Sequence, residues 1–395
     1  MDATSTPFDN ANNRGPTLTV DTVVPYLLQR GLVTSTLIVD GDLEITDVGR
    51  RNENIKVVCR NGPSYFLKQP GEGEPSTQAT MCREAAFYSL CQISPEAASL
   101  LRIIPGFHCW DEDRFLLILE LINGHPLWEH YATTIAPDFP CDSAVPLGEA
   151  LGTLHRVYRA RSSQSELSSV MRLPSSLPWI LFGHRPSPDI FTRLSPGGLQ
   201  VLKLLQRDRP MTAELDSLRN EWIADTVIHG DIKGDNVLVI APADEDVQVS
   251  LVDWELMQVG DAAWDVGNVF HDFLGYWLLS VPLSGDLAPE QMLEKAQIPL
   301  ANLHPATRSF WNAYRDSVPL NDAAGNFLIR SVRFAAARMA QGAYELSAST
   351  QFPSNLAIMM LQLAANILAD PSNAVLHLLG ISAPWRQSGH VPSNS

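Results

Sequence analysis

The chain has 395 residues, of which 45% are hydrophobic and 18% charged, a composition that allows a large core and argues against global disorder. Its formal net charge of −16 disfavours binding to nucleic acid or to an anionic membrane, so we expect neither as a partner. The five cysteines show no C-x-x-C spacing, which argues against a disulfide framework or a structural zinc site and fits a reducing cytoplasm.

Both ends of the chain are polar, and we expect disordered tails over residues 1–17 and 386–395. The first residues contain neither the basic start nor the apolar stretch of a signal peptide. The most apolar late segment, Leu356–Leu368, is interrupted by polar residues and is too short to cross a bilayer, so it should form a buried helix. The sequence therefore predicts a cytoplasmic protein, and nothing in it indicates an oligomeric state.

Residues 18–122 are expected to form an N-terminal lobe, a mostly antiparallel sheet with one inserted helix. A helix is predicted over Val20–Arg30, with Gly31 as its terminator, and a second helix from Ser76 to about Cys91. Asn61-Gly62 lies between two apolar runs and predicts a hairpin. The predicted strands are Leu43–Val48, Ile55–Arg60, Tyr65–Lys68, Leu101–Trp110 and Arg114–Ile122.

Helical patterns dominate residues 123–385, which are expected to form a C-terminal lobe. A β-type patch over Thr226–Ile240 and Val247–Asp253 interrupts them. The predicted helices are Pro126–Thr133, Ala144–Arg161, Gly197–Gln206, Thr212–Ile223 and several between about Ala263 and Leu379. The fold class is therefore α+β, with a small antiparallel β lobe that carries one inserted helix and a large, mainly helical lobe.

Two polar motifs follow apolar runs inside this β-type patch. His229–Asn236 reads H-G-D-I-K-G-D-N, and Leu251–Glu255 reads L-V-D-W-E. Phosphoryl transfer requires in-line positioning and neutralisation of phosphate charge. Asp231 is suited to orient an acceptor hydroxyl and take its proton, whereas Asn236 and Asp253 supply the hard oxygen ligands that Mg²⁺ prefers.

These motifs resemble those of the aminoglycoside phosphotransferase and choline-kinase family, which is related to the protein kinases. The resemblance extends from about Ile38 to Leu379 and includes G-D-A-A-W-D, which ends at Asp265. It implies a bilobal protein-kinase-like fold and an ATP- and Mg²⁺-dependent transfer of the γ-phosphoryl group to a hydroxyl of a small molecule. It also implies that His229 and Asp265 organise the catalytic loop.

The same resemblance implies that residues 18–122 form the nucleotide-binding lobe and residues 123–385 the catalytic and acceptor lobe, and it implies how the nucleotide is bound. Lys68 matches the lysine that grips the α- and β-phosphates, and Glu84 matches its glutamate partner on the following helix. The loop Asp47–Asn54 has one glycine, and we expect Gly49 and Asn52 to face phosphate there, with Arg50 or Arg51 adding charge. Adenine should lie against the linker that contains Glu120 and Ile122. The expected apolar walls of the adenine site are Ile55, Phe66 and Ile118.

Lys233 is an unusual residue for this family of small-molecule kinases. Ser/Thr protein kinases carry a lysine two residues after the catalytic aspartate, where a cation stabilises charge on the γ-phosphate. We therefore expect Lys233 to assist catalysis, and it admits a peptide Ser/Thr kinase in modified-peptide biosynthesis as an alternative. Glu255 replaces the flexible glycine of D-F-G, so we expect an enzyme that is active without phosphorylation.

The acceptor pocket is expected to be lined from Trp264–Tyr276 and Asn312–Tyr344, although most of the aromatic residues there should belong to the core. The last 25 residues contain no Asp or Glu, which weakens the case for a cationic antibiotic as the acceptor. A third alternative is a non-catalytic nucleotide-binding scaffold of the same fold. The presence of Lys68, Glu84, Asp231, Asn236 and Asp253 together argues against a scaffold.

Overall fold

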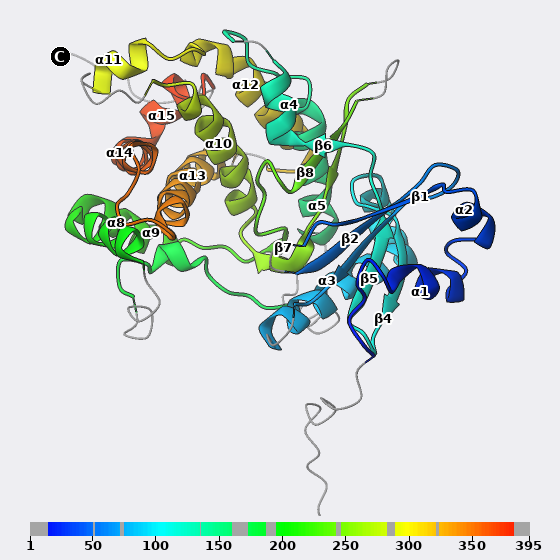
Figure 1. Ribbon diagram of the computed structural model, residues 1–395. Coiled ribbons are helices and arrows are strands. Elements are labelled where there is room, and N and C mark those ends of the chain that lie inside the picture. The colour runs from blue at the N-terminus through cyan, green and yellow to red at the C-terminus, as the bar shows by residue number, and fades with distance from the viewer. Residues whose placement is uncertain are drawn as a thin grey trace, which may run out of the picture. The chain divides into compact units, whose positions relative to one another are not determined.

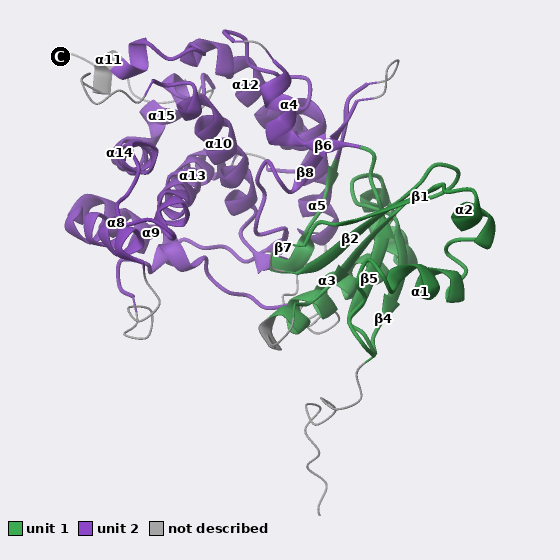
Figure 2. Cartoon of the chain, viewed as in Figure 1, with its two compact units in different colours: residues 1–123, 250–256 green, residues 124–249, 257–395 purple. Residues whose placement is uncertain are grey.

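A computed structural model describes residues 15–49, 52–71, 75–134, 136–159, 173–186, 195–241, 246–282, 289–320 and 324–382. The chain divides into two compact units, residues 1–123 with 250–256 and residues 124–249 with 257–395 (Figure 2). The expected tail over 386–395 and residues 1–14 of the expected N-terminal tail lie outside the described residues.

Unit 1 is built on a five-stranded antiparallel sheet with the strand order β1-β2-β3-β5-β4 (Figure 1). The strands are β1 Leu43–Asp47, β2 Glu53–Cys59, β3 Tyr65–Gln69, β4 Phe107–Asp111 and β5 Leu116–Glu120. The helices are α1 Val23–Gln29, α2 Ser35–Val39, α3 Pro75–Ile93, and the 3-10 helices η1 Pro95–Arg102 and η3 Trp254–Leu256.

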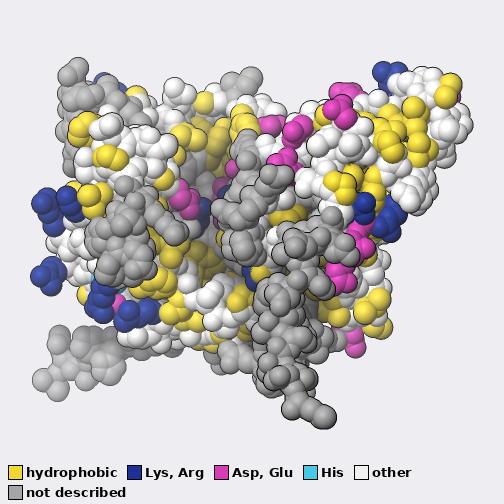
Figure 3. All heavy atoms as spheres, turned by 60° about the horizontal axis from the view of Figure 1, so that its bottom comes forward, with side chains coloured by type: hydrophobic (Ala, Val, Ile, Leu, Met, Phe, Trp, Pro, Cys, Tyr) yellow, Lys and Arg dark blue, Asp and Glu magenta, His cyan; other side chains and the backbone are white. Residues whose placement is uncertain are grey.

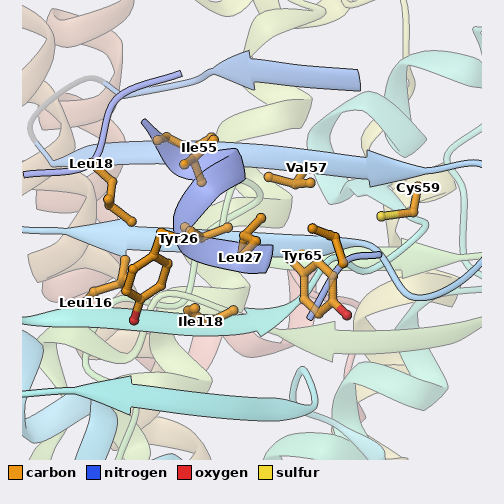
Figure 4. Close-up of a cluster of buried hydrophobic side chains, with 12 residues drawn as sticks. Leu18, Tyr26, Leu27, Ile55, Val57, Cys59, Tyr65, Leu116 and Ile118 are labelled. Atoms are coloured by element: carbon orange, nitrogen blue, oxygen red, sulfur yellow. The ribbon is translucent and has the colours of Figure 1, made fainter. Parts of the chain in front are cut away.

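The two faces of this sheet have different environments because side chains alternate along each strand. Leu67 of β3 pairs with Ile55 of β2 and with Ile118 of β5. All three side chains are buried in one hydrophobic cluster together with Tyr26 and Leu27 of α1 (Figure 4). Lys68, the next residue of β3, therefore lies on the opposite face of the sheet.

One predicted strand of unit 1 is wrong over its first half. Leu101–Trp110 was expected to be extended, but η1 continues to Arg102 and β4 begins only at Phe107. Pro105 and Gly106 separate the two elements, and Pro105 has no N–H to donate to a sheet. The apolar run favoured a strand because short apolar segments of a buried helix and of a strand look alike in sequence.

Unit 2 is mainly helical and contains short strands (Figure 1). β7 Thr226–Ile228 pairs with β10 Gln258–Gly260, and a second sheet has the order β6 His125–Pro126, β8 Val237–Ile240, β9 Gln248–Leu251. The helices are α4 Leu127–Thr133, α5 Ala144–Arg159, α8 Pro196–Arg207, α9 Arg209–Asn220, α10 Ala262–Leu279, α11 Pro289–Glu294, α12 Leu300–Ser317, α13 Ala324–Ser347, α14 Asn355–Ala369, α15 Pro371–His377 and the 3-10 helix η2 Trp179–Leu181.

α10 and α13 approach each other closely in the core of unit 2. Gly267 makes this contact possible, because a Cβ atom there would lie 2.6 Å from the carbonyl oxygen of Ser331. Phe270 and Phe334, one from each helix, are both fully buried. α10 is thus packed tightly against α13. The side of α10 that carries Asp265 and Asp272 contacts the polar loop that follows β7.

The expected α+β fold class, with an antiparallel sheet and a large helical region, is confirmed. Leu356–Leu368 lies within the helix α14, as expected. Some residues of this segment are buried, and the others are partly or fully exposed. Within the described ranges, no helix combines the length and the apolar character needed to cross a membrane. Acidic and basic side chains are spread among apolar ones on the face shown in Figure 3.

Candidate active site

A buried lysine is held by two carboxylates in unit 1. Lys68 Nζ lies 2.6 Å from Glu84 Oε2 and 2.7 Å from Asp253 Oδ1. β3 directs Lys68 to the face of the sheet where α3 presents Glu84, and both residues are almost completely buried. Removing such charges from water is costly unless they are closely paired, so the three side chains depend on one another.

The protonation of this group follows from its burial and its charges. Burial by itself lowers the pKa of Lys68, but the carboxylates of Glu84 and Asp253 outweigh it and raise the pKa above its ordinary value. Burial raises the pKa of Glu84, against the opposing effect of the Lys68 ammonium. Lys68 is therefore a permanent cation whose direction is set by its two partners.

Asp253 is presented by a short, strained turn after β9. Its φ of 67° lies in the left-handed region, which Asp and Asn tolerate better than most residues. The next residue, Trp254, is fully buried and stacks on Phe87 of α3 with ring centroids 4.2 Å apart. The Trp254 backbone N–H donates to Glu84 Oε1 over 3.3 Å. Trp254 thus anchors the turn, while the Asp253 side chain stays 34% exposed.

The polar loop 229–236 of unit 2 runs from the end of β7 to the start of β8. Asp265 of α10 accepts hydrogen bonds from the backbone N–H groups of His229, at 2.8 Å, and Gly230, at 3.0 Å. Gly230 has a φ of 85°, which a residue with a Cβ atom rarely adopts. The indole of Trp264 donates to the Gly230 carbonyl at 3.1 Å. The first turn of α10 therefore fixes the start of the loop.

Asp265 also contacts a histidine that is not among the predicted site residues. His155 of α5 is fully buried, with Nε2 lying 3.2 Å from Asp265 Oδ2 and Nδ1 lying 2.9 Å from the Tyr314 hydroxyl. His155 and Asp265 are 110 positions apart, and no local pattern around His155 indicates the contact. His229 is also fully buried.

The loop brings two of the predicted residues, Lys233 and Asn236, together around Asp231. Lys233 Nζ forms an ion pair with Asp231 Oδ2 at 2.5 Å. The Asn236 amide nitrogen donates to the Asp231 carbonyl at 2.9 Å and to Asp231 Oδ2 at 3.2 Å. Since the amide nitrogen faces Asp231, the Asn236 Oδ1 atom is turned away from the Asp231 carboxylate.

Asp272 holds the later part of the same loop. Its Oδ1 atom accepts a hydrogen bond of 2.9 Å from the Gly234 N–H. A Cβ atom on Gly234 would lie 3.1 Å from Trp128 Cβ, so this position favours glycine. Burial raises the pKa of Asp272 to about 6, opposed by the Gly234 N–H and by Arg338. α10 therefore anchors the loop at two points, Asp265 and Asp272.

The residues predicted to bind the nucleotide, other than Lys68 and Glu84, lie in separate parts of unit 1. The Gly49 N–H donates to Asp47 Oδ1 at 2.8 Å, and a Cβ atom on Gly49 would lie 2.8 Å from the Asn52 carbonyl oxygen. Glu120 ends β5, where its carboxylate accepts from the Gly106 N–H at 3.1 Å, and Ile122 follows it, partly buried. Arg50 and Arg51 lie outside the described residues.

Two expected walls of the adenine site are wrong. Ile55 and Ile118 belong to the cluster under α1, on the face of the sheet opposite to Lys68 (Figure 4). Phe66 is two residues from Lys68 on β3 and shares its face, so it alone of the three stays a candidate. The error arose because strand register, which decides the face, is not visible in the sequence.

Comparison with known proteins assigns the chain to a family. The model of the APH family, described as the phosphotransferase enzyme family, matches residues 43–291. No curated protein matches the sequence. Choline kinase from Cryptosporidium parvum Iowa II has 14% identity and a TM-score of 0.52, with 91% of this chain and 99% of that chain covered.

Two further solved structures have lower TM-scores. Plasmodium vivax ethanolamine kinase is 15% identical, with a TM-score of 0.48 and coverage of 91% of this chain and 90% of that one. Macrolide 2′-phosphotransferase from Brachybacterium faecium is 14% identical, with a TM-score of 0.46 and coverage of 89% and 98%. At these identities the likeness to choline kinase shows the fold alone, and it confirms the expected protein-kinase-like fold. Since the family model spans more than half of the chain, this protein belongs to the phosphotransferase enzyme family and is a phosphotransferase.

Proposed function

We propose that this enzyme transfers the γ-phosphoryl group of ATP to a hydroxyl of a small molecule in a Mg²⁺-dependent reaction in the cytoplasm. The observation that carries the proposal is the constellation of Asp231, Lys233 and Asn236 on one anchored loop. Positioning and charge neutralisation are the main demands of phosphoryl transfer, and a loop with a fixed backbone meets the first of them.

In this proposal Asp231 orients the acceptor hydroxyl and accepts its proton as the new O–P bond forms. General-base catalysis of this kind contributes a factor of about 10² to 10⁴. Lys233 pairs with the Asp231 carboxylate and supplies positive charge beside the transferred group. His229 and Asp265 hold the loop in shape, as the buried contacts of Asp265 support.

On the nucleotide side, Lys68 binds the α- and β-phosphates, and Glu84 sets its direction. The buried ion pair supports this role, because a charge that is costly to bury is commonly retained at a functional site. The loop that holds Gly49 and Asn52 would cover the phosphates, and the Gly49 N–H would first have to leave Asp47 Oδ1 to bind them. Glu120 and Ile122 would present the backbone that reads the edge of the adenine ring.

Asn236 and Asp253 are the proposed Mg²⁺ ligands. Their side-chain oxygens are of the type that Mg²⁺ prefers, and Mg²⁺ commonly binds one or two protein groups together with phosphates and waters. The hydrogen bond from the Asn236 amide nitrogen to the Asp231 carbonyl fixes the orientation of the Asn236 side chain. The Asp253 carboxylate is partly exposed. When bound, the metal neutralises charge on the phosphates.

We propose a small-molecule acceptor in preference to the peptide alternative. The peptide alternative depends on Lys233. The ion pair of Lys233 with Asp231 gives this lysine a role within the loop that does not require a peptide substrate. We do not retain the alternative of a non-catalytic scaffold, because the chain belongs to a family of enzymes. Choline kinase from Cryptosporidium parvum Iowa II, which shares the fold, is named for a small-molecule acceptor.

ATP turnover by the purified protein tests the proposal. With Mg·ATP the parent should release ADP, and Asp231→Asn should lower the rate about 10²- to 10⁴-fold. Asp253→Ala should abolish turnover, and chelation of Mg²⁺ should do the same reversibly. Asp138→Asn, at an exposed position, is the matched control and should behave as the parent. Equal turnover in the parent, Asp231→Asn and Asp253→Ala would show that the site is misassigned.

A further inference from the structure

One face of α10 lies along the catalytic loop. Asp265 and Asp272, two helical turns apart, accept hydrogen bonds from loop N–H groups at His229, Gly230 and Gly234. Asn268 is three residues after Asp265 and four before Asp272, so its side chain points to the same side of the helix between them. Asn268 is fully buried.

Among the residues that the structure describes, none is a hydrogen-bond partner for either end of the Asn268 amide. Neither Nδ2 nor Oδ1 makes a hydrogen bond to any described residue, although both atoms are shielded from solvent. Buried amides in native proteins are almost always hydrogen-bonded, and an exception calls for a specific explanation. An amide that offers one donor group and one acceptor beside a catalytic loop is suited to a ligand that supplies both.

Two more unpartnered atoms lie on α10 and on the helix packed against it. His271 Nδ1, one turn further along α10, and Gln341 Oε1 of α13 are buried without a hydrogen bond among the described residues. α13 lies against His271, because a Cβ atom on Gly342 would be 3.4 Å from His271 Cε1. A Cβ atom on Gly275 would meet only His271 Cε1, at 4.0 Å, so there is space beside the imidazole.

The unpartnered groups are all uncharged. Burial and the nearby Arg338 hold the pKa of His271 well below its ordinary value, so the imidazole is neutral. The charge of Arg338 is balanced by Glu345, whose Oε2 atom lies 3.1 Å from Arg338 Nη1. Neutral donors and acceptors match hydroxyl groups, each of which can donate one hydrogen bond and accept two.

We propose that the acceptor binds against Asn268, His271 and Gln341, and that it is an uncharged molecule with several hydroxyl groups, such as a sugar or a polyol. Asp272, the residue after His271 on α10, holds Gly234 of the loop that carries Asp231, so the proposed site lies on the helix that anchors this loop. The inference rests on the proposed function, since it takes loop 229–236 as the catalytic loop. A site that hydrogen-bonds substrate hydroxyls strongly rejects analogues that lack them.

Steady-state kinetics with defined acceptors tests the inference. The probes are glycerol, myo-inositol and glucose as neutral polyols, with choline and ethanolamine as cationic alcohols. The parent should phosphorylate at least one polyol with a higher kcat/KM than either amine. Asn268→Leu should raise the KM for that polyol by about tenfold or more, which is the loss of one or two hydrogen bonds.

The control separates binding from a merely structural role. Asn268→Leu should not lower the midpoint of thermal unfolding, because leucine has a similar volume and removes an unpaired amide. Gln362→Leu replaces an exposed amide of α14 and should leave the acceptor KM within about twofold of the parent, as surface changes usually do. A lower unfolding midpoint with an unchanged KM would mean that Asn268 only holds an internal water, and it would overturn the inference.

The remaining outcomes distinguish the inference from the proposed function. Preference for choline or ethanolamine, or no transfer to any polyol, would overturn the acceptor class. Transfer by the parent with the same acceptor KM in Asn268→Leu would overturn the site and leave the proposed function standing. Absence of both ATP turnover and phosphoryl transfer in the parent would instead refute the proposed function.

Discussion

Lys68 and Glu84 form an ion pair of 2.6 Å in which the two side chains are only 5% and 0% exposed. The pair joins the third strand of the sheet to the long helix that follows it, and Trp254 N–H binds the second oxygen of Glu84. In such a position neither charge is tolerated without the other, so the same contact that would direct Lys68 toward phosphate also supports unit 1.

Substitution of Lys68 by methionine should therefore destabilise the protein as well as inactivate it. It leaves Glu84 buried and unpaired, which costs about 3–5 kcal/mol in the free energy of unfolding. The double variant Lys68→Met with Glu84→Leu should regain part of that loss but no activity. Lys56→Met on the exposed side of β2 should change stability by less than about 0.5 kcal/mol. Urea unfolding measures these differences, and a Lys68→Met protein as stable as the parent would contradict the argument.

Asp265→Asn should loosen the catalytic loop. The carboxylate accepts from two backbone N–H groups and contacts His155, and an amide has only one acceptor oxygen. We expect a loss of about 1.5–3 kcal/mol in the free energy of unfolding, the contribution of one hydrogen bond to a charged group. The turnover number should fall more than the nucleotide affinity. Asp316→Asn on the surface is the control, and identical kinetics of the two variants would rule out the anchoring role.

Asparagine and alanine at position 253 should differ in stability but not in activity. Both remove the carboxylate from Lys68 and from the proposed metal site, so both proteins should be inactive with Mg·ATP. Asn tolerates the left-handed backbone of Asp253, whereas Ala is strained there by about 1–2 kcal/mol. Thermal unfolding should place Asp253→Ala below Asp253→Asn. Equal midpoints would show that the turn relaxes when the side chain is lost.

Asp272 should make stability depend on pH in the acid range. Its folded-state pKa is about 6, raised by burial, whereas an Asp carboxyl in an unfolded chain titrates near 4. The folded protein therefore keeps a proton that the unfolded chain has released between about pH 4 and pH 6. The stability contributed by this group is fully present below about pH 4 and is lost as pH rises to about 6, by up to about 3 kcal/mol.

Asp272→Asn removes this titration and isolates it. The free energy of unfolding of the variant, relative to the parent, should rise between about pH 4 and pH 6 and stay constant above that range. The exposed control Asp138→Asn should show no such trend. A difference between Asp272→Asn and the parent that stays constant from pH 4 to pH 7 would mean that Asp272 is ionised throughout.

Much of the secondary structure was predictable from local sequence patterns. Strand alternation and turn residues located β1, β2 and β3 to within a few residues, because each depends on neighbours in sequence. The motif at His229–Asn236 was found on a loop between two strands for the same reason. Where the local signal was ambiguous, at Leu101–Trp110, the prediction failed.

Contacts between distant segments were not accessible in this way. The support of Asp265 by His155, the link from Asp272 to Gly234 and the unpaired amide of Asn268 all depend on how α5 and α10 pack around the loop. The side of the sheet on which Ile55 and Ile118 lie depends on strand register. None of these leaves a periodic trace in the sequence, since each is set by tertiary packing.

The sequence by itself determined the chemical groups and the order in which they occur: a strand lysine, a helix glutamate, a loop with Asp231 and Asn236, and a turn with Asp253. Residue chemistry and short-range periodicity are sufficient for that. Only the tertiary structure decided which groups are buried, which share a face, and which atoms of α10 are left without partners beside the loop. Burial and pairing are properties of packing, and they set the charge of Lys68, the pKa of Asp272 and the neutral character of the proposed acceptor site.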